Sequence, residues 1–249
     1  GIRDKLVTGV QTCALPIFPL RETLETISHD NDIRVVVLTG AGHGFCSGAD
    51  LEDPGMMPNI DGLTVTSIAR RALELLDDVI HAIRRMHQPV IAAVNGAAIG
   101  GGFCLACACD MRIGAEEAYF RAAGINNGLT AAELGISYLL PREVGSARAF
   151  DIMLTGRDVD AAEAERIGLL SRVVPGDRLL EECYAVADRM IGYSRVGLEV
   201  TKRMLWSSLD AASLQAHMDH EGIAQLYVRL TTQNFEEAIR ARRERRSPD

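Results

Sequence analysis

Two short β-branched runs, separated by an amphipathic helix, constrain the fold of this chain more than any other feature of its sequence. RVVVLTG (34–40) and PVIAAVNG (89–96) are continuous apolar stretches closed by glycine, which is typical of strands buried on both faces. Between them, residues 67–86 place apolar side chains at helical spacing, with charged residues on the other faces. Strand, helix, strand is the parallel crossover unit, so the sequence predicts an α/β fold with a parallel sheet.

The alternation of strands and helices is expected to continue as far as Pro175. Glycines 100–102 open an apolar helix, MRIG (111–114) and AYF (118–120) are predicted as short strands, and GLLSRVVP (168–175) passes from helix to strand. Asp160 and Glu163 form an acid-led capping box at a helix start. Only helical patterns follow, at 179–191, 194–206, 214–230 and 234–245. The last third of the chain is therefore predicted to form a separate helical layer or lobe.

Composition narrows the class of function. The chain has 249 residues, 47% of them apolar, which is enough to bury the core of one large domain. With 34 acidic and 26 basic residues the formal net charge is −8, which argues against binding to nucleic acid or to an anionic membrane. No run approaches the roughly 18 apolar residues of a membrane span. The six cysteines lie mostly in apolar runs, which fits a reducing compartment. We expect a cytoplasmic protein that acts on a small molecule.

Two glycine-rich loops follow the two predicted strands. They are GAGHGFCSGADL (40–51) and NGAAIGGG (95–102). Glycine lets the backbone approach a ligand closely, and the free N–H groups at a helix start bind anions. Loops from neighbouring strands can aim two N–H donors at one oxygen, which is the geometry of an oxyanion hole. Each loop taken alone is more simply a tight strand-to-helix turn.

The amino-acid sequences of these loops resemble those of a known family. FCSGADL and PVIAAVNGAAIGGG, with LLPREVG and LTGRDVDAAEAERIGLLSRVVP further on, resemble the crotonase superfamily, also called the enoyl-CoA hydratase/isomerase family. The resemblance runs from about Arg34 to the C-terminus. It implies a crotonase-like spiral core of ββα turns over 18–190 and a C-terminal helical region, 191–249, used for trimerisation. It also implies a coenzyme A thioester as substrate, no bound cofactor or metal, and a homotrimer or a dimer of trimers.

The resemblance also implies which residues form the site. In the family, two backbone N–H groups hold the thioester oxygen as it becomes an enolate, and at the matching positions they belong to Ala49 and Gly101. Removing one such donor typically costs about 3 kcal/mol of transition-state stabilisation. The neighbours of these two donors are predicted to bind the substrate: Gly48, Asp50, Leu51, Gly100, Gly102 and Cys104.

The acid/base residues depart from the hydratase pattern. Hydratases of the family use two glutamates, and the matching positions here are Cys104 and Gly124, so ordinary hydration is not expected. Glu133, in GLTAAELGISYLLPR, stands where dienoyl-CoA isomerases and 4-chlorobenzoyl-CoA dehalogenases carry a catalytic aspartate. We predict that Glu133 is the single acid/base of a double-bond isomerisation. Nucleophilic attack by Glu133, giving a hydrolase or dehalogenase, and a non-catalytic thioester-binding protein are the alternatives.

Glu133 and Cys104 also have structural interpretations. Thr130 and Glu133 form Thr-x-x-Glu, a capping box in which the glutamate would only satisfy backbone N–H groups. Cys104 would be a nucleophile if a nearby helix start lowered its pKa, but a small buried hydrophobic residue is the simpler interpretation. Cys104 and Cys107 are not followed by a second Cys-x-x-Cys pair, so zinc is not expected.

The first residues fit none of these patterns. Residues 7–17, VTGVQTCALPI, resemble the conceptual translation of a sequencing-adapter oligonucleotide, so residues 1–17 are predicted to be non-native. Native sequence would then resume near Phe18, inside a helix; an irregular strand is the alternative. Because the family begins with strands that pair with the sheet and a loop that helps to hold the adenine end of coenzyme A, replacement predicts an exposed sheet edge, weaker binding and a tendency to associate.

Overall fold

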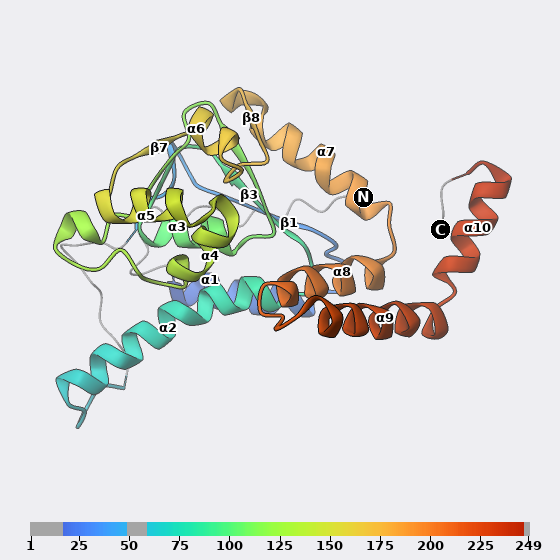
Figure 1. The fold of residues 1–249 in the computed structure, drawn as a ribbon, viewed down its shortest axis with the longest axis horizontal. Coiled ribbons are helices and arrows are strands. Elements are labelled where there is room, and N and C mark those ends of the chain that lie inside the picture. The colour runs from blue at the N-terminus through green and yellow to red at the C-terminus, as the bar shows by residue number, and fades with distance from the viewer. Residues whose placement is uncertain (1–16, 49–58, 247–249) are drawn as a thin grey trace.

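The computed structural model describes residues 17–48 and 59–246 (Figure 1). The first predicted crossover is confirmed. β1 (Val36–Thr39) and β3 (Val90–Val94) pair in parallel, and α2 (Val65–Arg85) lies between them along the chain. Both strands were visible in the sequence because they lie inside the core, and every residue of β3 is buried. β5 (Met111–Ala115) and β8 (Arg172–Val174) complete a parallel sheet in the order β1-β3-β5-β8.

A second sheet runs beside the first. Its strands are β2 (Gly44–Cys46), β4 (Ala97–Ile99), β6 (Tyr119–Arg121) and β7 (Val159–Asp160), in the order β2-β4-β6-β7, with only β7 antiparallel. β1, β3 and β5 are each followed within a few residues by a strand of this second sheet, and the first two pairs are followed by a helix. This repetition is the predicted spiral of ββα turns.

The helix α3 (Gly101–Ala108) occupies the centre of the core, and all eight of its residues are buried. It contacts β2, β4, α2 and α4 (Ile136–Val144), which explains why its sequence is apolar on every face. α1 (Ile17–His29) lies along α2, in agreement with the helix predicted after the unusual first residues. α5 (Ser146–Thr155) packs on α4.

The predicted capping box at Asp160 is half confirmed. The Asp160 carboxylate accepts a hydrogen bond of 2.7 Å from the Glu163 N–H at the start of α6 (Ala161–Arg166). The Glu163 carboxylate, however, pairs with the Arg157 guanidinium at 2.7 Å. A bidentate arginine pair is stronger than a neutral backbone hydrogen bond, so the glutamate is used there.

The C-terminal helices, predicted to form a separate layer or lobe, divide into two groups. α7 (Leu179–Ile191) packs on β1, β3 and β5 and belongs to the core, because its buried face covers the open side of the first sheet. α8 (Arg195–Ser208) lies near the end of α2, while α9 (Leu214–Thr231) and α10 (Asn234–Glu244) extend away from the sheets (Figure 1). The boundary at 190/191 stays a prediction.

Two further expectations from the sequence concern an exposed sheet edge and membrane-spanning helices. β1 and β2 are the outer strands of their sheets among the described residues, but residues 1–16, which bear on the predicted sheet edge, lie outside the described residues. In the ranges 17–48 and 59–246, no helix combines the length and the apolar character that crossing a bilayer requires.

Candidate active site

The two glycine-rich loops predicted from the sequence meet in space. Gly48 has φ of +89°, and a methyl group at its Cα would lie 3.6 Å from the Gly101 amide nitrogen and only 2.9 Å from the Ile99 carbonyl oxygen. A side chain at position 48 is therefore excluded by both backbone conformation and space. The loop that leads to Ala49 thus lies against the start of α3, as an oxyanion hole between the two would require.

The start of α3 supplies backbone donors that the helix itself leaves without acceptors. Gly100 is its N-cap residue, and Gly101 and Gly102 are the first residues of the helix, so their N–H groups have no acceptor within the helix. The Gly100 N–H itself donates to the Arg121 carbonyl at 2.9 Å, which fixes the turn to β6. Ala49, Asp50 and Leu51 lie outside the described residues, so their predicted roles stay predictions.

A half-buried side-chain amide holds the first of these loops in place. The Asn95 side chain donates to the carbonyl oxygens of Gly40, Gly42 and Gly44, at 3.1–3.3 Å, and accepts from the Gly40 N–H at 3.1 Å. No motif in the sequence marks Asn95 as functional. The only signal was its place directly after β3, where a side chain of one strand reaches the loop of its neighbour.

Glu133 faces this glycine turn. Its Oε1 lies 3.5 Å from where a methyl group on Gly100 would stand, so the carboxylate points at the residue before Gly101. The side chain is half-buried, and desolvation raises the pKa of its carboxyl group. A half-buried carboxyl group beside backbone N–H donors is what proton transfer next to an enolate requires.

The capping interpretation of Glu133 is wrong. The Thr130 hydroxyl accepts from the Ala132 N–H at 3.1 Å, which is a local turn, and α4 begins only at Ile136. Gly135, in the left-handed conformation with φ of +79°, is the N-cap residue of α4. No capping box forms at Thr130 and Glu133, because Gly135 lets the chain turn before α4 starts.

Cys104 is fully buried in α3 behind the Glu133 turn. Its Sγ lies 3.6 Å from the Glu133 carbonyl oxygen, to which the thiol donates. Burial, and secondarily the Glu133 charge, raise the pKa of the thiol well above its ordinary value. The thiolate is therefore disfavoured, and the nucleophile interpretation of Cys104 loses its physical basis. Contact between Cys104 and the substrate stays a prediction.

Gly124, the second position at which the sequence departs from the hydratase pattern, also lies in a loop without space for a side chain. A methyl group on Gly124 would lie 2.0 Å from the Thr130 carbonyl oxygen, so this loop has no room for any side chain at that position.

The part of the chain that the structure describes contains no group of three or more histidine, cysteine, aspartate or glutamate residues placed to hold a metal ion.

Comparison with known proteins identifies the family. The family model for enoyl-CoA hydratase/isomerase matches residues 13–249. The chain belongs to the enoyl-CoA hydratase/isomerase family. A protein named probable enoyl-CoA hydratase from Mycobacterium bovis is 66% identical over 230 residues, which are 92% of this chain and 81% of the relative. One from Thermus thermophilus with a similar name is 35% identical over 92% of this chain and 87% of its own length.

Solved structures of the family agree with the fold. A probable enoyl-CoA hydratase/isomerase from Mycobacterium abscessus is 64% identical, with a TM-score of 0.89 over 94% of this chain and 86% of that one. A protein described as a monofunctional enoyl CoA isomerase from M. smegmatis is 60% identical, with a TM-score of 0.70 over 83% of this chain and 87% of that one. The crotonase resemblance and the predicted α/β spiral are confirmed, and the family is one of enzymes.

Proposed function

We propose that this member of the family isomerises a double bond of an enoyl-CoA thioester, with Glu133 as its single proton carrier. The observation that carries the proposal is the position of the Glu133 carboxylate against Gly100, the residue before Gly101. Cys104 and Gly124 stand where the two hydratase glutamates would be, and neither supplies a carboxylate. Adding water needs groups to position it and to deliver a proton, whereas isomerisation moves one proton between two carbons.

In the proposed reaction, the thioester oxygen accepts hydrogen bonds from the N–H groups of Gly101 and Ala49. These bonds stabilise the negative charge that develops when Glu133 removes a proton from the carbon next to the carbonyl. The resulting dienolate takes the same proton back at the far end of the conjugated system, and Glu133 returns to its carboxylate form. No atom is gained or lost, and coenzyme A takes part only as a portion of the substrate.

Two further observations support the proposal. The raised pKa of Glu133 brings its proton affinity closer to that of a general acid at neutral pH, so one group can both take and return a proton. The name of the M. smegmatis relative, at 60% identity, is that of an isomerase without a second activity.

The test is incubation with a panel of saturated, 2-enoyl, 3-enoyl, dienoyl and aryl CoA thioesters, followed by mass spectrometry and chromatographic separation of isomers. Isomerisation predicts a product of unchanged mass from the 3-enoyl or dienoyl substrates. Gain of water would show that hydration proceeds without the two glutamates and would contradict the proposal. Release of coenzyme A would favour Glu133 as a nucleophile, and a single turnover in isotopically labelled water would then leave label in its carboxyl group.

We also propose that the active form is a homotrimer or a dimer of trimers. α9 presents large apolar side chains to solvent in the described structure: Leu214, Met218, Ile223, Leu226, Tyr227 and Leu230 are all more than half exposed. Ile223, Leu226, Tyr227 and Leu230 share one face of the helix, and an exposed apolar face of this kind usually marks a contact between subunits.

A further inference from the structure

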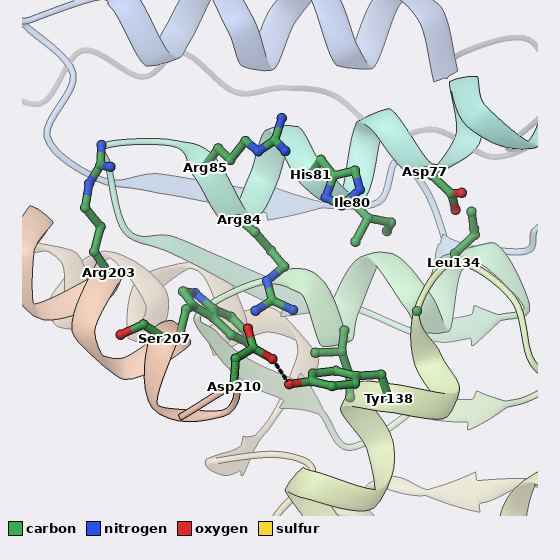
Figure 2. Close-up of a pocket in the computed structure, with 13 residues that line it drawn as sticks. Asp77, Ile80, His81, Arg84, Arg85, Leu134, Tyr138, Arg203, Ser207 and Asp210 are labelled. Atoms are coloured by element: carbon green, nitrogen blue, oxygen red, sulfur yellow. Dashed lines mark hydrogen bonds between the residues drawn. The ribbon is translucent and has the colours of Figure 1, made fainter. Parts of the chain in front are cut away.

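A cavity of about 620 Å³ lies beside the Glu133 turn, whose next residues, Leu134 and Gly135, line it. It opens between the C-terminal half of α2, the start of α4 and the end of α8 (Figure 2). Its volume is in the range of sites for small organic molecules. Its lining combines apolar side chains with charged side chains of both signs, among them Arg84, Arg203, Asp77 and Asp210.

Arg84 is the residue that makes this cavity unusual. Its side chain is half-buried, and its guanidinium carbon lies 3.9 Å from the centre of the Trp206 ring. Within residues 17–48 and 59–246 the guanidinium donates no hydrogen bond and forms no ion pair. Figure 2 shows it extending from α2 towards the hydrogen bond between Tyr138 and Asp210. No acceptor among the described residues takes its five N–H donors, although the carboxylates of Asp210, Asp110 and Glu143 lie near enough to favour its charge.

The groups around Arg84 are already committed to other partners. Tyr138 donates to the Asp210 carboxylate and, at 3.0 Å, to the Leu209 carbonyl oxygen. The Trp206 indole N–H donates to Asp110 at 2.6 Å, which fixes the ring beneath the guanidinium. Arg203, at the edge of the cavity, is paired with Glu199 at 3.0 Å. The site around Arg84 is therefore preorganised and leaves its donors for a ligand.

We propose that this cavity binds a carboxylate with an apolar body, the carboxylate on the guanidinium of Arg84 and the body against Ile80, Leu134 and Leu139. Arginine matches a carboxylate with two parallel hydrogen bonds, and stacking on an aromatic ring holds the guanidinium plane in place. The three apolar side chains give the remainder of such a molecule a surface to bury. Binding at this cavity does not depend on the proposed isomerisation.

Trp206 is the only tryptophan of the chain, so tryptophan fluorescence reports on binding at this site. Titration of the full chain with octanoate should change the tryptophan fluorescence in a saturable way. Octanol, which has the same apolar body without the charge, should bind at least tenfold more weakly. Equal binding of the two, or no change with octanoate, would overturn the proposal, and this comparison needs no variant. Octyl phosphate binding tenfold more tightly than octanoate would overturn the assignment to carboxylates.

Variants then test Arg84 itself. Arg84→Met should weaken octanoate binding at least tenfold and leave octanol binding unchanged, with an unchanged far-ultraviolet circular dichroism spectrum. Arg203→Met is the matched control: it removes the same charge from the same cavity, but from a guanidinium already paired with Glu199. It should alter octanoate binding less than twofold. Similar losses in both variants would show a general charge effect and contradict a bound carboxylate at Arg84.

The carboxylate has two possible sources, a free acid or the far end of an acyl chain on coenzyme A, because Leu134 follows Glu133 directly. Displacement of octanoate by a thioester with a terminal carboxylate, but not by its methyl-terminated equivalent, would identify the acyl chain. Displacement by neither would identify a free acid. This comparison alone rests on the proposed function, and turnover of the methyl-terminated thioester checks that function separately.

Discussion

Glu133 lies half-buried on the turn before α4, and desolvation raises the pKa of its carboxyl group. Replacing it by glutamine keeps the shape and removes the proton-carrying group. We expect Glu133→Gln to lower kcat by about 10²- to 10⁴-fold, the usual contribution of general acid/base catalysis, with KM changed little. The control Glu116→Gln alters an exposed glutamate and should leave kcat unchanged. A variant that retains turnover would place the acid/base elsewhere.

The raised pKa also fixes the direction of the pH dependence. Glu133 must be ionised to remove a proton, so kcat/KM should fall as the pH drops through the pKa of its carboxyl group. Because that pKa is above the ordinary 4.5, the acid limb should lie at higher pH than for an unperturbed glutamate. A pH–rate profile with its acid limb at or below 4.5 would disagree with the structure.

The free energy of unfolding should change with pH in the opposite direction to kcat/KM. The folded protein binds the Glu133 proton more tightly than the unfolded chain, so ionisation at higher pH destabilises the folded state. Glu133→Gln should therefore be more stable than the parent at neutral pH, and the difference should vanish at acid pH below both pKa values. Urea unfolding at the two conditions measures this. A variant less stable at neutral pH would show that the carboxylate is stabilised by its surroundings.

Gly102 tests how closely α3 packs on the second sheet. A methyl group there would lie 2.1 Å from the Cys46 carbonyl oxygen, so Gly102→Ala should force the two elements apart and cost about 1–3 kcal/mol, the usual penalty of overpacking. Gly44→Ala is the control, since its nearest contact would be an ordinary 3.8 Å. Equal unfolding free energies of the two variants would contradict the packing described here.

At the scale of elements, one buried lysine joins α8 to the rest of the fold. The Lys202 Nζ pairs with Asp110 at 2.8 Å and donates to the carbonyl oxygens of Ile83, at 3.1 Å, and Gln88, at 2.9 Å. These contacts reach the end of α2 and the residues that precede β3 and β5. The position of α8, and with it Trp206, therefore depends on a charge that is 6% exposed.

Removing that charge should loosen α8. Lys202→Met leaves Asp110 without its buried partner, and breaking a buried pair in this way typically costs about 3–5 kcal/mol. Arg203→Met breaks the neighbouring exposed pair with Glu199 and should cost about 0.2–1 kcal/mol. Denaturant unfolding of both variants compares them on the same helix. Similar costs would mean that the buried pair contributes no more than a surface one.

At the scale of the whole molecule, the exposed apolar face of α9 supports the proposed assembly. Ile223, Leu226 and Leu230 lie on one face of α9 at spacings of three and four residues, and each is more than half exposed. Light scattering after size exclusion should give a trimer or hexamer. Leu226→Glu should dissociate it, whereas Gln225→Glu, which adds the same charge one residue away, should not. A monomeric parent chain would contradict the proposed assembly.

The sequence by itself determined the elements whose patterns are long. β1, β3, α2 and the helices after residue 178 follow from apolar runs or helical spacing over several turns, because periodicity is a local property of the chain. β2, β4 and β7 were not predicted, since their two or three residues stand in glycine-rich or polar sequence, whereas the equally short β6 and β8 lie in the runs AYF and RVVP. The glycine loops were found because glycine marks backbone that must turn or approach closely.

Only the tertiary structure decided what those residues do together. It placed Gly48 against Gly101 and the Glu133 carboxylate against Gly100, and it showed that Thr130 does not cap a helix with Glu133. It also brought Arg84 and Trp206, 122 positions apart, into stacking contact. Such contacts join residues far apart in the chain, and their geometry depends on how whole elements pack. No local pattern of side chains records that packing.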